Sequence, residues 1–471
     1  MPEENPLPLS DLLKQAQAAR LSNNLDHAAM LLAHAFERQP ESLWVAKELA
    51  LLHQQRGEWL EARDCLELIL AQEPNNTEAL NVLGHVYQSW GKLSEALTHW
   101  QRAVEIKPDY AEAWQNLGLA HEHLDQQPEA IAAHQQAVRL QPHNARAHRL
   151  LGMAQLDYGL LPAANQCFDR ALELDPNDPE NQWQHFFIRA LAGDFPAAWP
   201  LYECRFRLPG RTTPDHDFDQ PRWQGEPLPS QTLLLHAEQG YGDTIQMARY
   251  IPQVAKRVNR LIIWAPEPLV PLLKTMTGVD EVISRKTSAL EFDIHLPLMS
   301  LPGVFNDSLE TIPCAVPYLG TPSSTAPANP PRTVGLAWAG SGSQSLDRRS
   351  LQTEALAPLL NVPLEWHSLQ FGQPVKLPVL DHSADITNFS DTADLIQSLD
   401  LVISVDTAVA HLAGALGKPV WVLLSQAPDW RWGHEGATTR WYPTARLFRR
   451  TDRETWPTLI NRVALKLQNW A

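Results

Sequence analysis

The sequence has little cysteine and little positive charge, and both shortages exclude classes of protein. Its four cysteines, Cys65, Cys167, Cys204 and Cys314, are far apart and form no C-x-x-C pair, so neither a disulfide framework nor a zinc cluster is expected. The 38 lysines and arginines are outnumbered by 54 aspartates and glutamates, which gives a net charge of −16. Nucleic acid is therefore not expected as the main partner, because binding to phosphates needs a basic face.

Long apolar runs are also scarce. The first ten residues, MPEENPLPLS, are acidic and proline-rich and lack the apolar region of a signal peptide. The most apolar C-terminal stretch, residues 401–424, is interrupted by Asp406, His411 and Lys418, so no membrane span is expected. The 471 residues, of which 44% are hydrophobic and 20% charged, predict a globular cytoplasmic protein of about three domains.

Proline recurs at a fixed interval in the first part of the chain. It occupies every 34th position, at Pro40, Pro74, Pro108, Pro142 and Pro176. A 34-residue period is typical of the tetratricopeptide repeat (TPR), a pair of packed helices. In such a pair a proline ends the second helix, because it has no N–H to donate. The sequence predicts five full repeats over residues 9–176.

A degenerate sixth repeat is expected over residues 179–210, because it keeps Gly193 and Ala198 but has Phe186 where glycine is expected. It also ends in Gly210 instead of proline, as expected of a terminal repeat that docks onto another part of the chain. The predicted helical array therefore spans residues 1–210.

Stacked repeats form a concave groove, and several polar side chains are expected to line it. These candidates for acceptor binding are Asn81, His85, Gln115, Asn116 and Arg149. At the position where some TPR proteins carry an asparagine ladder for peptides, Asn116 is present but Val82 and Leu150 replace the others. Two interpretations stay open: a groove that binds a protein partner, and a solvated surface.

The chain changes character after residue 210, where segments typical of strands and helices alternate. A linker at 211–229 precedes a first series of segments in 230–322. A second linker at 323–332 precedes another series in 333–471. Strands are expected at 231–238, 261–266, 292–298, 333–340, 365–370, 401–406 and 419–424. Helices are expected at 244–257, 269–276, 351–361, 391–399 and 407–416. This alternation predicts two Rossmann-like lobes with parallel sheets and a cleft between them.

The turn after the first of these strands contains Gly240, Gly242 and Asp243. The two glycines allow a tight turn and a close approach of the backbone to another group. Asp243 would begin the following helix, and two interpretations are open. Its carboxylate either caps the backbone N–H groups there or points into the cleft as a general base.

The loop after the strand at 333–340 combines small and basic residues. Gly340 and Ser341 would expose backbone N–H groups, and the N-terminus of a helix favours anions. Arg348 and Arg349 add the paired N–H donors that suit a diphosphate. The alternative is a solvated pair of arginines on the surface.

A third loop follows the apolar strand at 401–406. Asp406 closes that strand, Thr407 and Ala408 begin the next helix, and His411 lies one turn further along. Thr407 and His411 are four residues apart and share a face of the helix. Asp406 could also be a helix cap, and His411 could be a buried core residue.

Together these loops resemble those of the ADP-heptose glycosyltransferases, which are heptosyltransferase-like GT-B enzymes. Gly242-Asp243-Thr244 matches the first lobe of that family, and Asp406-Thr407-Ala408 with His411 matches the second. The family usually has glycine in place of Ala408. Repeats followed by such lobes also resemble bacterial TPR glycosyltransferases.

The resemblance implies a metal-independent transfer of sugar from a nucleotide sugar, with no other cofactor. Asp243 would be the base, while Arg348 or Arg349 would neutralise the diphosphate. Asp406, Thr407 and His411 would hold the sugar and phosphate, and Gln370 would lie near the nucleoside. The repeats would recruit the acceptor, whose reacting group would be a protein hydroxyl. Two alternatives remain: a non-catalytic scaffold, and an enzyme that acts on a glycan.

Overall fold

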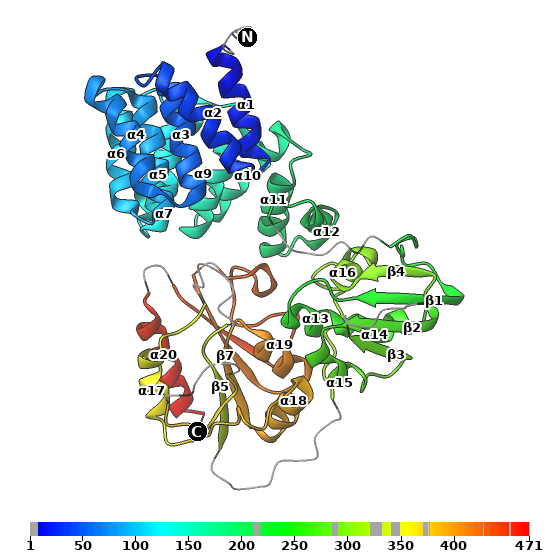
Figure 1. Cartoon of the computed structure of the whole chain (residues 1–471). Coiled ribbons are helices and arrows are strands. Elements are labelled where there is room, and N and C mark those ends of the chain that lie inside the picture. The colour runs from blue at the N-terminus through cyan, green and yellow to red at the C-terminus, as the bar shows by residue number, and fades with distance from the viewer. Residues whose placement is uncertain are drawn as a thin grey trace. The chain divides into compact units, whose positions relative to one another are not determined.

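The computed structural model describes residues 8–210, 216, 218–284, 291–320, 332–340, 349–370, 375, 377–426, 428–451 and 454–470. The chain divides into two compact units, Met1–Pro176 and Asn177–Ala471. Figure 1 shows helices alone in the first unit, and two sheets with their helices in the second. This confirms the predicted order of a helical repeat array followed by an α/β region.

The described residues of the first unit form ten helices, which pack as five consecutive pairs. They are α1 (Leu9–Leu21), α2 (Leu25–Arg38), α3 (Leu43–Arg56), α4 (Trp59–Gln72), α5 (Thr77–Ser89), α6 (Leu93–Ile106), α7 (Ala111–His123), α8 (Gln127–Leu140), α9 (Ala145–Asp157) and α10 (Leu161–Leu174). Each of the five periodic prolines lies two residues beyond the second helix of a pair. The first helices also contact one another, α1 with α3, α3 with α5 and α7 with α9. They therefore form one layer of the array.

The spacing between paired helices depends on glycine, as Gly84 shows. A Cβ added at Gly84 would lie 2.4 Å from Nε1 of Trp100, which is too close for any side chain. Trp100 itself is fully buried, and its Nε1 donates a hydrogen bond to the carbonyl oxygen of Asn81 (3.1 Å). The glycine thus lets the large ring of α6 fill the seam against α5.

The sixth helical pair belongs to the second unit, whereas the predicted array extended to residue 210. It consists of α11 (Pro179–Leu191), α12 (Phe195–Tyr202) and the 3-10 turn η1 (Glu203–Phe206). The physical reason is an aromatic cluster in which Phe186 and Trp199 pack against Trp430, with ring centroids 5.6 and 5.7 Å away. The division therefore falls at Pro176, before the apolar side chains that face the α/β region.

The second unit contains two sheets in which every described pair of strands is parallel. The first has the order β3-β2-β1-β4, with β1 (Leu228–His236), β2 (Val258–Ala265), β3 (Glu281–Ser284) and β4 (Ile294–Pro297). The second has the order β6-β5-β7-β8-β9, with β5 (Thr333–Ala337), β6 (Glu365–Ser368), β7 (Leu401–Val405), β8 (Val420–Leu424) and β9 (Ala445–Arg449). Two parallel sheets fit the predicted Rossmann-like lobes.

Several helices of the first lobe are shorter than predicted, and proline accounts for the breaks. The helix expected at 244–257 is divided into α13 (Tyr241–Met247), a 3-10 turn, and α14 (Ile251–Ala255), which begins at Ile251-Pro252. The helix expected at 269–276 is reduced to α15 (Val270–Leu273), which again has a proline in its first turn. Proline favours the first turn of a helix and disrupts its interior. The short helix α16 (Leu301–Val304) follows β4.

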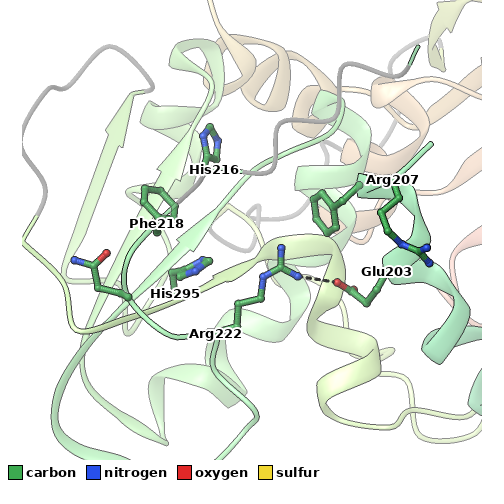
Figure 2. Close-up of a pocket in the computed structure, with 8 residues that line it drawn as sticks. Glu203, Arg207, His216, Phe218, Arg222 and His295 are labelled. Atoms are coloured by element: carbon green, nitrogen blue, oxygen red, sulfur yellow. Dashed lines mark hydrogen bonds and ion pairs between the residues drawn. The ribbon is translucent and has the colours of Figure 1, made fainter. Parts of the chain in front are cut away.

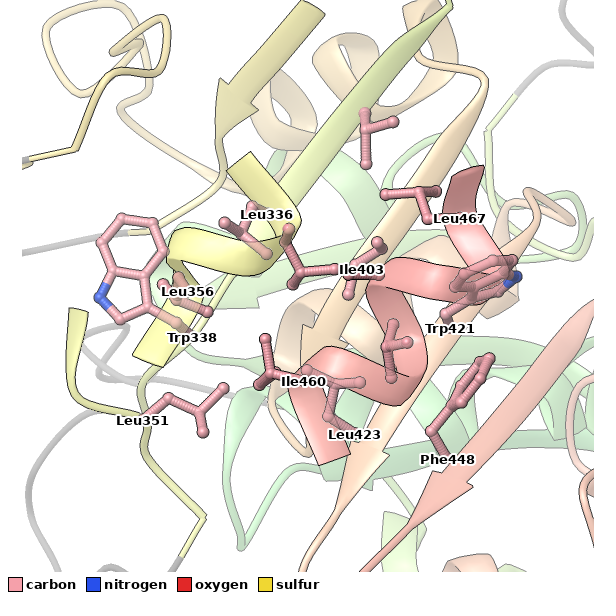
Figure 3. Close-up of a cluster of buried hydrophobic side chains, with 14 of the residues drawn as sticks. Leu336, Trp338, Leu351, Leu356, Ile403, Trp421, Leu423, Phe448, Ile460 and Leu467 are labelled. Atoms are coloured by element: carbon pink, nitrogen blue, oxygen red, sulfur yellow. The ribbon is translucent and has the colours of Figure 1, made fainter. Parts of the chain in front are cut away.

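The second lobe has a continuous apolar core between its sheet and two helices. Leu336, Ile403 and Leu423 project from the sheet toward Leu356 and Ile460, and all five are nearly inaccessible to solvent (Figure 3). The helices on this side are α17 (Ala357–Leu360) and α20 (Trp456–Gln468), and α18 (Phe389–Ser398) and α19 (Ala408–Ala415) lie on the other side (Figure 1). The loop between β7 and α19 lies at the carboxyl end of the sheet, where polar groups can bind a ligand.

No helix among the described residues is both long enough and apolar enough to cross a membrane.

Candidate active site

The first turns of α13 and α19 meet where β1 and β7 end. A Cβ at Gly242 would lie 2.9 Å from Cδ2 of His411 and 3.4 Å from Cα of Ala408. Any side chain at residue 242 would therefore push the two helices apart. Because the carboxyl ends of parallel strands are where α/β proteins bind ligands, this contact joins the predicted loops of both lobes into one candidate site.

Asp243 uses both of its carboxylate oxygens within the protein. Oδ2 accepts a hydrogen bond from the backbone N–H of Gly240 (2.9 Å). Gly240 is the N-cap residue of α13 and Asp243 is the third residue of that helix, so Asp243 is not the N-cap that one interpretation of the sequence expected. Oδ1 accepts one from the guanidinium of Arg431. Burial raises the pKa of Asp243, and the charge of Arg431 opposes that rise. These bonds do not exclude the predicted role as a base, which stays a prediction.

Arg431 was not predicted, and it bonds to three side chains around the described site. It lies in the 3-10 turn η6 (Trp430–Trp432), and 9% of its side chain is exposed. Besides its bond to Asp243, it donates to Oε1 of Gln246 and to Oδ1 of Asp429, both at 2.8 Å. These carboxylates raise the pKa of Arg431, so it stays charged despite its burial. The alternation of charge and tryptophan in Asp429-Trp430-Arg431-Trp432 was the sequence signal that could have identified it.

Asp406 and His411 lie together at the start of α19, as predicted. The carboxylate Oδ1 of Asp406 is 3.9 Å from Nε2 of His411. The Nδ1 of His411 is 2.9 Å from the hydroxyl of Tyr442, and its ring stacks on Trp432 at 5.2 Å. Burial lowers the pKa of His411 well below its ordinary value, so the imidazole is neutral at pH 7.

Thr407 occupies the N-cap position of α19, and its hydroxyl lies 3.1 Å from that of Ser404. Asp406 is therefore not the N-cap residue. Burial raises the pKa of Asp406 to about 6, and the negative charge of Asp429 adds to this effect. A carboxyl group that titrates near pH 6 is thus held at the junction of the two lobes.

This shift predicts a pH-dependent stability effect for Asp406→Asn. An unfolded aspartate has a pKa of about 3.9, so between pH 4 and 6 the native state binds a proton that the unfolded state has lost. Stability from this group is therefore lost as the pH rises through that window. Relative to the wild type, the free energy of unfolding of the variant should rise by up to about 3 kcal/mol from pH 4 to pH 7.5. Urea unfolding at both pH values measures this, and a pH-independent difference would contradict it.

The loop after β5 brings one of the predicted arginines to the site. Arg349 donates to the carbonyl oxygen of Asp406 (3.4 Å). Burial raises the pKa of both Asp243 and Asp406, and the charge of Arg349 opposes that rise. The N–H of Gly340 donates to the hydroxyl of Ser350 (3.0 Å). The other two predicted residues of this loop, Ser341 and Arg348, lie outside the described residues.

Gln370 contacts the protein backbone of the same loop. Its Oε1 accepts from the N–H groups of Trp338 (3.2 Å) and Ala339 (3.0 Å), and its Nε2 donates to the carbonyl oxygen of Ala339 (3.0 Å). These bonds hold the chain just before Gly340. The predicted contact of Gln370 with a nucleoside stays a prediction.

In the repeat array, three predicted groove residues form a polar network between α5 and α7. The Nδ2 of Asn116 donates to Oδ1 of Asn81 (2.8 Å) and lies 3.1 Å from Nε2 of His85. The Nδ2 of Asn81 donates to Oε1 of Glu112 (3.1 Å). These groups stabilise the contact between neighbouring repeats. Four of the five predicted residues, Asn81, Gln115, Asn116 and Arg149, are buried. Acceptor binding by the five stays a prediction.

A separate pocket of about 370 Å³ lies beside the edge strand β4. Figure 2 shows His216, Phe218 and His295 on one side of it and Arg222 bonded to Glu203 on the other. The Arg222 to Glu203 distance is 3.1 Å. Nowhere in the described part of the chain do three or more His, Cys, Asp or Glu side chains form a group that could hold a metal ion. This pocket was not predicted from the sequence.

Comparison with known families gives a match within the second lobe. Residues 384–456 match the model of Glycosyltransferase family 9 (heptosyltransferase). This range includes Asp406, His411 and Arg431. Residues 89–125 match a TPR repeat model, and residues 126–179 match a tetratricopeptide repeat model.

Among curated proteins, the chain is similar to Protein FlbA of Caulobacter vibrioides, with 26% identity over 340 residues. The match covers 62% of this chain, and the chain spans 56% of FlbA.

Two solved structures are also similar over part of this chain. TTC0263, a TPR protein of Thermus thermophilus, shares 22% identity with a TM-score of 0.33, over 38% of this chain and 97% of that one. PilF of Pseudomonas aeruginosa shares 17% identity with a TM-score of 0.38, over 43% of this chain and 93% of that one.

The family match supports a glycosyltransferase and agrees with the resemblance of the three loops. The residues that it spans also contribute four members of the described site, Asp406, His411, Asp429 and Arg431. The chain therefore combines tetratricopeptide repeats with a Glycosyltransferase family 9 (heptosyltransferase) domain.

Proposed function

We propose that this chain is a metal-independent GT-B glycosyltransferase that moves a sugar from a nucleotide sugar to a protein hydroxyl. One observation carries the proposal. Asp243 of the first lobe forms an ion pair with Arg431 of the second lobe. Arg431 lies within the residues that match Glycosyltransferase family 9. A carboxylate from one lobe and a guanidinium from the other thus meet at the carboxyl ends of two parallel sheets. A substrate held by both lobes would react there.

The donor diphosphate is proposed to bind near Arg349 and the first turn of α19. Arg349 lies at the carbonyl of Asp406, directly before that helix. Thr407 makes no side-chain capping bond, so the first N–H groups of α19 keep their capacity to donate to an anion. A guanidinium and a helix N-terminus both stabilise negative charge on a leaving diphosphate without requiring a metal ion.

Asp243 is proposed as the base for the acceptor hydroxyl. As the hydroxyl oxygen bonds to the anomeric carbon of the sugar, its proton passes to the Asp243 carboxylate, and the bond from that carbon to the diphosphate breaks. Arg431 holds the Asp243 carboxylate in one orientation through a charge-assisted hydrogen bond. Burial raises the pKa of Asp243 and so makes it a better proton acceptor than an exposed aspartate.

The acceptor is proposed to be a protein that binds the repeat array. The array contains five helical pairs that form a compact unit distinct from the α/β region. Repeat arrays of this kind present extended surfaces on which partner proteins bind. Recruitment by the array would raise the local concentration of the acceptor near the transferase lobes.

Arg349→Ala tests the donor site. Loss of one charge-assisted contact should weaken nucleotide-sugar binding about ten- to a hundredfold, which corresponds to roughly 1.5–3 kcal/mol. Isothermal calorimetry with a panel of nucleotide sugars measures this on the full chain. Arg446→Ala is the control, because Arg446 is an exposed residue of β9 in the same lobe. Equal affinities of wild type and Arg349→Ala would place Arg349 outside the donor site.

A further inference from the structure

We propose that residues 179–207, the α11–α12 pair with its following turn, are a positioning element that sets the Asp243–Arg431 pair. The expected change in kcat rests on the proposed function, whereas the expected change in hydrogen exchange does not. The element contacts both loops that carry the pair, one through hydrogen bonds and the other through aromatic packing.

The first contact fixes the chain segment that leads into α13. The hydroxyl of Tyr202 donates to Oε1 of Gln239 (3.1 Å). Nη2 of Arg205 donates to Oε1 of Glu238 (3.0 Å), and the exposed fractions of these two side chains are 1% and 0%. Gln239 and Glu238 directly precede Gly240, whose N–H bonds to Asp243. Tyr202 and Arg205 thus fix residues 238 and 239, and the next residue, Gly240, orients the Asp243 carboxylate.

A shared hydroxyl strengthens the Arg205 contact. Ser300, which follows β4, accepts from Nη2 of Arg205 (2.7 Å) and donates to Oε1 of Glu203 (2.7 Å). Glu203 also accepts from Nη1 of Arg205 (2.7 Å). The turn after α12 is therefore tied to two segments of the first lobe by buried charged groups, whose loss is costly.

The second contact fixes the turn that carries Arg431. Four aromatic side chains of the helical pair surround the ring of Trp430. Their ring centroids lie 5.6 Å (Phe186), 6.0 Å (Phe195), 5.7 Å (Trp199) and 6.4 Å (Tyr202) from it. Cζ of Arg431 lies 4.3 Å from the centroid of the Trp430 ring. Trp430 therefore links the packing of the helical pair to the position of the guanidinium.

Both partners of the ion pair thus depend on one element outside the two sheets. Small displacements of a reacting group reduce catalysis strongly, since the transition state requires a narrow range of geometry. The contact of Tyr202 with Gln239 can be removed without disturbing the aromatic packing, because phenylalanine keeps the ring. Removal of this hydrogen bond therefore tests the positioning of Asp243 separately from the folding of the chain.

The test compares Tyr202→Phe with Tyr250→Phe in the full chain. Tyr250 is a buried tyrosine of the same lobe, stacked on Phe305 at 5.7 Å, and no hydrogen bond joins it to the loops of the described site. We expect Tyr202→Phe to lower kcat roughly tenfold with less than a twofold change in nucleotide-sugar Kd. We also expect faster amide hydrogen exchange in residues 237–247. Tyr250→Phe should change neither kcat nor this exchange.

Hydrogen exchange keeps the two proposals distinguishable. Faster exchange at 237–247 in a protein that transfers no sugar would support the positioning element and refute the proposed function. Unchanged exchange and unchanged kcat in Tyr202→Phe would overturn the positioning element. Equal losses in the two variants would also overturn it, because they would reflect general destabilisation.

Discussion

Asp243→Asn is expected to lower turnover by roughly 10²–10⁴-fold, the usual loss when a general base is removed. Asparagine retains the shape and one acceptor oxygen, but it takes up no proton at neutral pH. Nucleotide-sugar affinity should change little, since the proposed donor contacts come from Arg349 and α19. Steady-state kinetics with saturating donor and acceptor measures the loss.

Asp429→Asn is the matched control for this variant. Both substitutions remove one carboxylate from Arg431, whose guanidinium bonds to Asp243 and Asp429. Both should therefore destabilise the protein by a similar amount, roughly 1–3 kcal/mol for a buried charged group that loses one partner. If Asp243 is the base, turnover falls at least tenfold more in Asp243→Asn than in Asp429→Asn. Equal losses would assign Asp243 a structural role only.

Truncation at residue 176 and at residue 210 is expected to give opposite results. A fragment of residues 177–471 should fold and bind nucleotide sugar, because it keeps the helical pair α11–α12. A fragment of residues 211–471 should aggregate, because it loses the aromatic rings that cover Trp430 and Trp441. Each buried aromatic or aliphatic side chain contributes roughly 1.5–3 kcal/mol. The free energy of unfolding of a folded domain is about 5–15 kcal/mol, so the loss of several such side chains would remove a large part of it.

Circular dichroism, sedimentation and calorimetry on the two fragments measure this difference. Residues 1–176 should form a helical array on their own, and the 177–471 fragment should bind the donor yet modify the acceptor poorly. A monomeric 211–471 fragment that unfolds as cooperatively as the 177–471 fragment would contradict the boundary. Acceptor modification by 177–471 at the rate of the full chain would contradict recruitment by the array.

Periodic and apolar patterns made most of the fold predictable. The 34-residue spacing of proline predicted five repeats over residues 9–176, where the structure has five helical pairs, because each repeat has the same packing requirement. The strands at β1, β5, β7 and β8 were predicted from their apolar runs. The short strand β3 was missed, since its four residues bury only Val282 and Ile283. The strand β9 and helix α20 were also missed, because the last strand was placed at 419–424.

The candidate site was predictable only where local motifs carry the chemistry. Asp243, Asp406 and His411 follow strands in recognisable turns, and the structure brings them together. Arg431 lies in a 3-10 turn with no glycine motif, and its partner Asp243 is 188 positions away in the sequence. The docking of the sixth repeat onto another part of the chain was predicted, but its partner in the fold was missed for a similar reason. The residues that decide it, such as Phe186 and Trp430, pack together only in the folded chain.

The most direct test of the central claim is the mass of a candidate acceptor protein after incubation with the full chain and a nucleotide sugar. The account predicts a gain of whole sugar residues on acceptor hydroxyl groups, with the gain abolished or slowed at least a hundredfold by Asp243→Asn. A panel of nucleotide sugars that bind the protein yet leave every acceptor, protein or glycan, unchanged in mass would contradict it. Transfer at an undiminished rate by Asp243→Asn would contradict the proposed base.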